Sequence, residues 1–338
     1  MNRNKVKIFG TFGPACQDVE TLKQMLREGM DGIRLNLSHT TLEEASPQIE
    51  AFHSAANACG LQAELLIDLQ GPELRIGVLA TPILLNEGET IRLHQIPFPS
   101  AVQAALKECP CGQKILLDDG KLLLTKTKAS EASTVQLRVL RGGQLESRKS
   151  IALPGLCIQM PALTEQDLAQ LRQAKKYGVS AVMQPFVRSR EDLVEVRHAL
   201  KQVGCDSIRL LAKVENQAGM EQLAELIPYC DEIVIARGDL GNSMELWELP
   251  AAQKRIAQAC RAARRDFMVV TQMLDSMTHS PVPTRAEVCD IFNAVQDGAS
   301  SVMVTGETAA GEYPVFAIRY LSKTVHEAEA FLEDTEGD

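Results

Sequence analysis

Short apolar runs alternate with amphipathic segments along most of the chain, and this alternation restricts the fold more than any other feature. Residues 208–214 and 233–236 have the length and composition of buried parallel strands. Residues 164–178 have the period of a helix, with Thr164 as its cap and Gly178 as its stop. Eight strand–helix pairs can be counted. This number predicts an α/β protein with a closed (β/α)8 TIM barrel rather than a doubly wound sheet.

The alternation is interrupted once, after the third predicted strand. From residue 76 to residue 150 apolar and polar side chains alternate, as in TIRLHQ and TVQLRVL, which is typical of short antiparallel strands. We therefore expect residues 1–75 and 151–338 to form the barrel. Residues 76–150 are expected to form an all-β lid inserted after strand three.

The composition narrows the classes of partner. Of the 338 residues 45% are hydrophobic, enough for a sizeable core, and the net charge of −9 argues against a nucleic-acid-binding protein. No apolar run approaches the roughly 20 residues of a membrane span, and no signal-peptide core follows the N-terminus. The nine scattered cysteines are typical of reduced thiols. We expect a cytoplasmic protein without nucleic-acid or membrane partners.

Polar side chains follow most of the apolar runs at the point where each run stops. They are Arg34, Asn36, Ser38, His39, Asp68, Arg75, Lys213, Glu215, Arg237, Asp239, Thr271, Gln272, Thr305, Glu307 and Thr308. In a (β/α)8 barrel the carboxyl ends of all strands meet at one face, where active sites lie. The sequence therefore predicts a single site at this face.

Glu215 and Asp239 indicate what chemistry such a site performs. Carboxylates on successive strand ends suit Mg²⁺, which prefers one or two carboxylates plus substrate oxygens. Lys213 lies two residues before Glu215, so both side chains point to the same face of a strand. Gly238 and Gly241 permit close approach of the backbone, whose amides can hold a carboxylate. The pattern is typical of a phosphoryl-transfer or enolate site.

Each of these residues also has a purely structural interpretation. Asp239 is compatible with a cap for the helix that follows it, and Lys213 with an ordinary salt-bridged lysine. Arg34 is compatible with an ion pair to Asp31 or Asp68. His39 is compatible with a helix start that carries no chemistry. The sequence leaves these alternatives open for single residues, although the joint pattern at six strand ends favours a site.

Several long motifs of the chain resemble those of the pyruvate kinase family. They are IRLNLSH, DLQGPELR, ALPG with MPALTEQD, AKVEN, ARGDLG, TQMLDSM, PTRAEV, NAVQDGA and TGETAAGEYP. The resemblance covers nearly the whole chain. It implies that the barrel is the family's A domain and the insertion its B domain, a lid.

The resemblance implies a role for each matching residue. Glu215 and Asp239 would bind Mg²⁺ or Mn²⁺, which bridges the phosphate and enolate oxygens of phosphoenolpyruvate. Lys213 would stabilise the phosphoryl group in flight, and Arg34 would contact it. Thr271 would lie beside the enolate carbon and, with the Gly238–Asp239 segment, help to hold the substrate carboxylate.

Two further groups follow from the same resemblance. A K⁺ site would be formed by Asn36, Ser38, Asp68 and the carbonyl of Leu69. Glu73 matches the potassium-dependent form of the family. His39, Arg75 and Lys149 would face the nucleotide.

The chain departs from the family pattern mainly on the nucleotide side. Ala310 replaces an expected lysine, Glu44 an expected tyrosine, and Gln70 a lysine. The expected function is phosphoryl transfer from phosphoenolpyruvate to ADP, which gives pyruvate and ATP. A metal-dependent 2-oxo-acid decarboxylase or lyase and a non-catalytic phosphoenolpyruvate-binding protein are the alternatives.

The end of the sequence carries one more expectation. The chain stops at Asp338, just after the eighth predicted helix, so we expect no C-terminal allosteric domain and no sugar-phosphate effector site. The family's barrel-to-barrel interface would still allow a homodimer.

Overall fold

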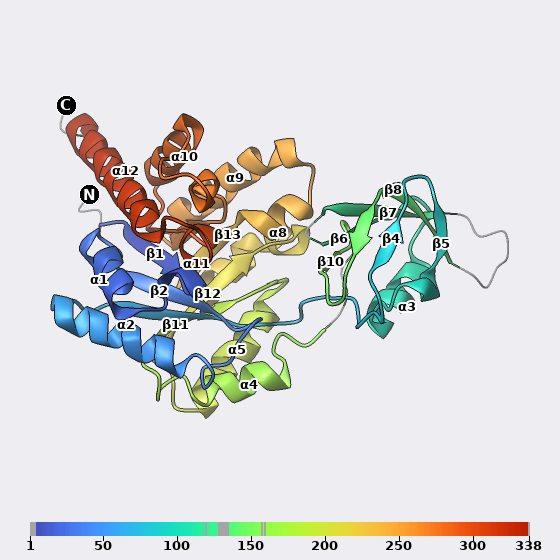
Figure 1. Ribbon diagram of the computed structural model, residues 1–338, viewed down its shortest axis with the longest axis horizontal. Coiled ribbons are helices and arrows are strands. Elements are labelled where there is room, and N and C mark those ends of the chain that lie inside the picture. Colours follow the sequence, from blue (N-terminus) through green and yellow to red (C-terminus); the bar gives the residue numbers. More distant parts are fainter. Residues whose placement is uncertain (1–4, 119, 128–134, 157, 159, 337–338) are drawn as a thin grey trace.

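A computed structural model describes residues 5–118, 120–127, 135–156, 158 and 160–336, and its centre is a closed barrel of eight parallel strands (Figure 1). The strands are β1 (Lys7–Thr11), β2 (Gly32–Asn36), β3 (Glu64–Asp68), β11 (Val179–Gln184), β12 (Arg209–Val214), β13 (Glu232–Ala236), β14 (Asp266–Val270) and β15 (Ser301–Met303). They pair in the order β1-β15-β14-β13-β12-β11-β3-β2. The predicted (β/α)8 barrel is confirmed.

Helices cover the outside of this barrel. They are α1 (Val19–Arg27), α2 (Ser46–Cys59), α4 (Glu165–Leu171), α5 (Arg190–Gln202), α6 (Gln217–Glu221), α7 (Leu223–Leu226), α8 (Arg237–Asn242), α9 (Leu249–Ala262), α10 (Arg285–Gln296), α11 (Gly306–Ala309) and α12 (Pro314–Glu336). Thr164 caps α4 as expected, because its hydroxyl accepts from the backbone N–H of Asp167 at 3.0 Å. Within the described part of the chain, none of the helices combines the length and apolarity that a bilayer crossing requires.

The barrel interior is built in layers because alternate residues of each strand point inward. Phe9, Leu66, Leu211, Val234 and Met268 belong to one buried apolar cluster contributed by five strands. The residues between them on each strand point outward and pack against the helices, as Ile8, Leu210 and Ile233 do. The interior is therefore a packed core rather than a channel.

Charged residues form the floor of the barrel, at the starts of the strands. Arg209 forms ion pairs with Glu64 and with Glu232, the latter at 3.3 Å between Nη1 and Oε2. Glu64 also pairs with Lys7, and Ser301 donates its hydroxyl to Glu232. These contacts connect β1, β3, β12, β13 and β15 at the end opposite the carboxyl ends of the strands.

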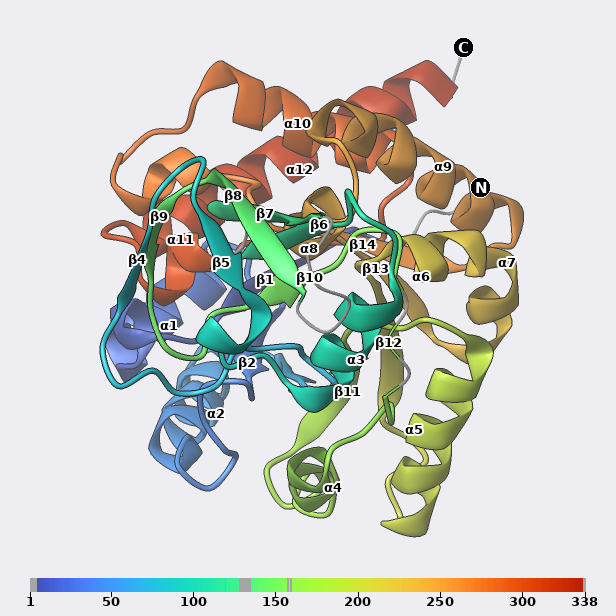
Figure 2. The same cartoon turned by 90° about the vertical axis from the view of Figure 1, so that its right-hand side faces the viewer.

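The segment between β3 and β11 forms separate sheets. Strands β10 (Ile151–Ala152), β6 (Lys114–Leu117), β7 (Leu122–Thr127), β8 (Gln136–Arg141) and β5 (Thr90–Arg92) pair in that order, and β4 (Ile83–Leu85) pairs with β9 (Gly143–Leu145). We call β4 to β10 the insert. It has its own apolar core, which includes Val102, Ile115, Leu124 and Leu137. Figure 2 shows the insert in front of the barrel.

The insert is not all β, so this part of the predicted fold was wrong. Helix α3 (Ser100–Glu108) lies against the sheet and buries Val102 and Leu106, which are spaced by one helical turn. The segment SAVQAALKE is rich in Ala and other good helix formers. Its short apolar period is hidden between runs of strand-like alternation, which explains why it was missed.

The insert contacts the barrel beyond α8. Lys114 Nζ lies 2.8 Å from Glu245 Oε1, just before the turn η4 (Leu246–Glu248). A Cβ atom built on Gly120 would lie 3.0 Å from Asn242 Oδ1, so these two residues are in close contact. The insert therefore touches the same helix that carries Asp239.

Two adjacent acids at the start of β13, Asp231 and Glu232, should respond to pH in opposite directions. Burial raises the pKa of Glu232, whereas Asp231 has a lowered pKa because its bonds to Arg197 and the Leu210 amide outweigh burial. Glu232→Gln should therefore increase the free energy of unfolding at pH 7, and the gain should disappear as acid protonates Glu232 in the wild type. Asp231→Asn should instead destabilise at pH 7, with a loss that shrinks at lower pH. Urea unfolding across pH tests both, and equal signs would contradict the assignment.

Candidate active site

Four charged side chains are buried together at the carboxyl ends of β2, β3 and β12. Lys213 Nζ lies 3.0 Å from Asp68 Oδ2 and 2.8 Å from Glu215 Oε1. Arg34 Nε donates to Asp68 Oδ2 at 2.9 Å. The exposed fractions of the Lys213, Asp68 and Glu215 side chains are only 12%, 3% and 1%. We call Arg34, Asp68, Lys213 and Glu215 the charge cluster.

The cluster holds two cations and two anions, and this balance is what makes burial of each charge tolerable. Burial alone would lower the pKa of Lys213, but the Asp68 and Glu215 carboxylates more than offset it, so the pKa is raised. Burial would likewise raise the pKa of Asp68, and Lys213 and Arg34 together lower it instead. Lys213 and Asp68 are therefore held in their charged forms.

Glu215 is the one acid of the cluster whose charge is opposed by its surroundings. Burial, only partly offset by Lys213, raises the pKa of Glu215 to about 7, and the Asp239 and Asp68 carboxylates add to the rise. Its Oε2 accepts the backbone N–H of Phe186 at 2.7 Å. A divalent cation between Glu215 and Asp239 would relieve the repulsion between these two acids. The donor set therefore fits Mg²⁺.

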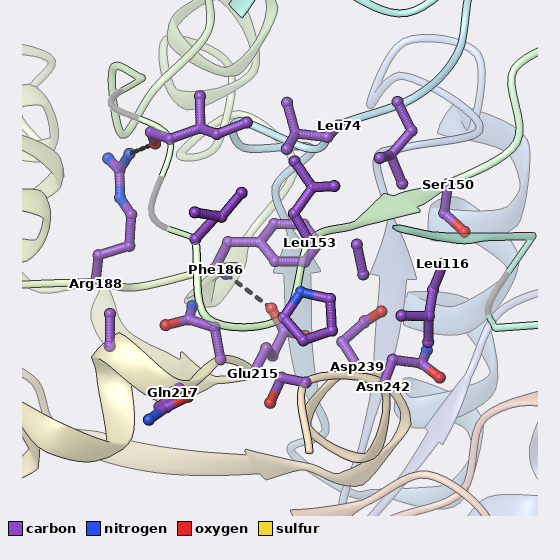
Figure 3. Close-up of a pocket in the computed structure, with 18 of the residues that line it drawn as sticks. Leu74, Leu116, Ser150, Leu153, Phe186, Arg188, Glu215, Gln217, Asp239 and Asn242 are labelled. Carbon is purple, nitrogen blue, oxygen red and sulfur yellow. Dashed lines mark hydrogen bonds between the residues drawn. The ribbon is translucent and has the colours of Figure 1, made fainter. Parts of the chain in front are cut away.

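Glu215 and Asp239 line one cleft between barrel and insert (Figure 3). Its volume is about 320 Å³, and Leu74, Leu116 and Phe186 contribute to its apolar wall. A second cleft of about 1120 Å³ is lined by Gly238, Asp239 and Thr271 and extends towards η4. Asp239 lies where the two clefts meet. Among the described residues no group of three or more His, Cys, Asp or Glu side chains is arranged to hold a metal.

Thr271 follows β14 in a strained backbone conformation. Its φ is 79° and that of Gln272 is 56°, so two consecutive non-glycine residues are left-handed. This conformation is unfavourable for a β-branched residue and is often found at functional sites. A Cβ atom built on Gly238 would lie 3.2 Å from Thr271 Cγ2, so glycine allows the two segments to approach.

For four residues the structure shows which of the structural contacts considered from the sequence are present. Arg34 pairs with Asp68, whereas Asp31 accepts the Ile8 amide, and Lys213 is salt-bridged within the charge cluster. Asp239 does not cap α8, because the cap residue is Ala236 and no side chain caps the helix. His39 is exposed in a turn before α2 and does not start that helix.

The residues predicted to hold K⁺ are adjacent in space. Asn36 and Asp68 are register partners at the ends of β2 and β3. The backbone N–H of Ser38 donates to Asn36 Oδ1 at 3.2 Å, and the Leu69 amide donates to the carbonyl of Met183 at 3.1 Å. Asp68 is shared with the charge cluster.

The residues predicted to face the nucleotide are engaged locally. Arg75 forms an ion pair with Glu73 at 2.8 Å, and Lys149 Nζ lies 3.0 Å from Asp118 Oδ1. Hydrogen bonding to Asp118 raises the pKa of Lys149. Neither of the two clefts is lined by His39, Arg75 or Lys149. These three residues therefore lie outside the lining of the clefts, although Glu73, the partner of Arg75, lines the smaller one.

Two contacts of the site were not anticipated from the sequence. The Phe186 amide fixes Glu215, and Phe186 itself has a left-handed φ of 53°. Arg237 donates to the carbonyl of Thr271 at 2.8 Å, although the sequence indicated only that it follows a strand. A local motif cannot reveal either contact, because both join separate strand ends.

The fold and site together define a (β/α)8-barrel protein with a buried cation and two acids at the mouth of the barrel. The family model for the pyruvate kinase barrel domain matches residues 3–318. The pyruvate kinase of Geobacillus stearothermophilus is 34% identical over 98% of this chain and 58% of its own length. Those of Methylorubrum extorquens and Mycobacterium intracellulare are 36% and 37% identical over 96% and 94% of this chain and 69% of their own lengths.

The chain belongs to the pyruvate kinase family. It spans 58% to 69% of the length of these three relatives.

Removal of one charge from the cluster should destabilise the protein more than removal of an oppositely charged pair. Asp68→Ala should lower the free energy of unfolding by about 3–5 kcal/mol, because it leaves Arg34 buried without its counterion. The double variant Asp68→Ala/Arg34→Met leaves Lys213 and Glu215 as one pair of opposite charges. It should therefore recover part of the lost free energy of unfolding. Urea unfolding of both variants provides the measurement. A double variant less stable than Asp68→Ala would contradict the proposed charge balance.

Proposed function

We propose that this protein transfers the phosphoryl group of phosphoenolpyruvate to ADP and so forms pyruvate and ATP. The charge cluster is the observation that carries the proposal, because it fixes a lysine ammonium 2.8 Å from the carboxylate of Glu215, which lines a cleft together with Asp239. Membership of the pyruvate kinase family supports the same reaction. Because the chain spans only part of its relatives, the activity itself belongs to the proposal.

The reaction exchanges one P–O bond for another. The bond from phosphorus to the enol oxygen breaks, a bond to a terminal oxygen of ADP forms, and the enolate then takes a proton at its methylene carbon. Catalysis of such a transfer rests on positioning and charge stabilisation. Lys213, oriented by Asp68 and Glu215, would counter the charge on the phosphoryl group in flight, and Arg34 would contact that group.

Two cation sites complete the proposal. Glu215 and Asp239 would hold Mg²⁺ or Mn²⁺, which when bound stabilises charge on the phosphate and enolate oxygens. Asn36, Ser38, Asp68 and the Leu69 carbonyl would hold K⁺. The position of Asn36 beside Asp68 in the strand register supports this second assignment.

The remaining assignments concern the substrate and the nucleotide. Thr271 would lie beside the enolate carbon, and the Gly238–Asp239 segment would contact the substrate carboxylate. His39, Arg75 and Lys149 would face ADP; Arg75 lies just before the insert, and Lys149 lies within it, between β9 and β10. We propose residues 76–150 as a lid over the barrel mouth, where its closure would exclude water.

We also propose that the protein forms a homodimer through the barrel and that it is located in the cytoplasm. The eight cysteines in the described part of the chain are all unpaired, in keeping with a reducing compartment.

Pyruvate formation should depend on ADP. Full-length protein is supplied with phosphoenolpyruvate, Mg²⁺ and K⁺, with and without ADP, and pyruvate and ATP are measured. We expect equal amounts of both products with ADP and almost none without it. Cleavage of a 2-oxo acid without nucleotide would favour the lyase, and binding of phosphoenolpyruvate without turnover would favour a non-catalytic protein.

Loss of the Lys213 ammonium should lower turnover selectively. Lys213→Met removes the cation that offsets charge on the phosphoryl group, so kcat should fall by about 10²-fold or more, while Mn²⁺ binding is retained. Lys254→Met is the matched control, since Lys254 is 50% exposed and pairs with Asp297 on the barrel surface. Unchanged kcat for Lys213→Met would show that the role assigned to Lys213 is wrong.

A further inference from the structure

Arg237 is a buried cation to which the proposed reaction assigns no direct part. It is the first residue of α8, and its side chain is only 11% exposed. Its Nε and Nη2 atoms donate to the carbonyl of Thr271 at 3.1 and 2.8 Å. Nη2 also donates to the carbonyl of Gln272 at 3.2 Å. One guanidinium therefore holds two consecutive backbone carbonyls of the loop after β14.

A second set of contacts orients this guanidinium. Nη1 donates to Asp290 Oδ2 on α10 at 2.7 Å and lies 3.5 Å from Gln253 Oε1 on α9. The planar fork of arginine can bond in two directions at once, which a lysine ammonium cannot do with the same geometry. Arg237 consequently joins the loop after β14 to two helices of the outer layer.

The loop that Arg237 holds is strained. Thr271 and Gln272 are both left-handed, and this conformation persists only where the surroundings impose it. Gly238 contacts Thr271 from another direction, because a Cβ atom there would lie 3.2 Å from Thr271 Cγ2. Arg237 thus holds the backbone of Thr271, and Gly238 leaves room for its side chain, from one short helix that also carries Asp239.

We propose that Arg237, oriented by Asp290, is a positioning residue that holds Thr271 in place for protonation of the enolate. This inference rests on the proposed function, in which Thr271 lies beside the enolate carbon. In that step the electron pair of the C=C bond forms a C–H bond with a solvent-derived proton, and the enolate oxygen becomes the carbonyl oxygen of pyruvate.

The same step can be measured without phosphoryl transfer. In D2O its reversal exchanges the methyl hydrogens of pyruvate for deuterium, which NMR follows directly. Full-length protein with pyruvate, Mg²⁺ and K⁺ provides this assay, and steady-state turnover of phosphoenolpyruvate with ADP provides kcat and KM. A residue that acts through Thr271 must affect exchange and kcat, whereas one that only stabilises the fold has no reason to do so in folded protein.

The decisive variant is Arg237→Lys, which keeps the charge but loses the fork. A small displacement of an aligned group can cost about 10²-fold in rate, so exchange and kcat should both fall by about that factor. KM for phosphoenolpyruvate should change far less than kcat. Arg190→Lys is the matched control, because Arg190 on α5 is 52% exposed, pairs with Glu191 and lines neither cleft, so both rates should be unchanged.

Asp290→Asn is a milder variant that keeps the shape of the side chain. It should lower exchange and kcat in the same direction, by a smaller factor, because the guanidinium loses its charged partner. Thermal unfolding identifies the folded variants, and if Arg237→Lys does not fold, Asp290→Asn decides the question. Exchange within about twofold of wild type in the folded variants would overturn the inference, as would a rise in KM with exchange retained. A wild-type protein that neither turns over phosphoenolpyruvate nor exchanges pyruvate would instead overturn the proposed function.

Discussion

The mouth of this barrel depends on four opposite charges that can be buried only together. An isolated lysine in the position of Lys213 would lose its proton or pull the strands apart to reach water, because desolvation of a single charge is very unfavourable. Asp68 and Glu215 remove that problem and at the same time fix the direction of the ammonium. The contacts that stabilise this part of the barrel therefore also preorganise the chemistry proposed for it. A free surface lysine would first have to be oriented by the substrate.

The two sides of the barrel mouth differ in the contacts that hold their charged side chains. On the side proposed for the metal, Glu215 is fixed by an ammonium and a backbone amide, and Asp239 lies on a helix directly beyond a strand. On the side proposed for the nucleotide, Arg75 and Lys149 are held by Glu73 and Asp118 in the insert and its connections. The residues that depart from the family pattern also lie outside the charge cluster. The carboxylate of Glu44 accepts the backbone N–H of Thr41 at 2.9 Å, and the backbone N–H of Gln70 donates to Asp167 Oδ1. Ala310 is exposed.

The sequence predicted the barrel and the acids of its mouth because both depend on local patterns. Apolar runs and helical periods identify strands and helices, and the parallel arrangement places Glu215 and Asp239 at one face. The partners of individual charged side chains could not be predicted in the same way. Whether Arg34 pairs with Asp31 or Asp68 depends on strand register, and the carbonyl of Thr271 is bound by Arg237, which comes from helix α8. The ion pairs at the barrel floor and helix α3 were not predicted for related reasons. Ion pairs between strands and a single short helix leave little periodic signal in the sequence.

The place where the insert leaves the barrel bears on how the chain reaches its fold. Strand β3 pairs with β11, so the wall of the barrel cannot continue until the whole insert has been synthesised. An unfolded insert would oppose that pairing through the entropy of closing a long loop. The insert has a core of its own, and its two ends already meet, since the Ile151 amide donates to the Leu74 carbonyl at 2.8 Å and Arg75 bridges to Ser150. An insert that folds first would present β3 and β11 as near neighbours and turn a distant pairing into a short one.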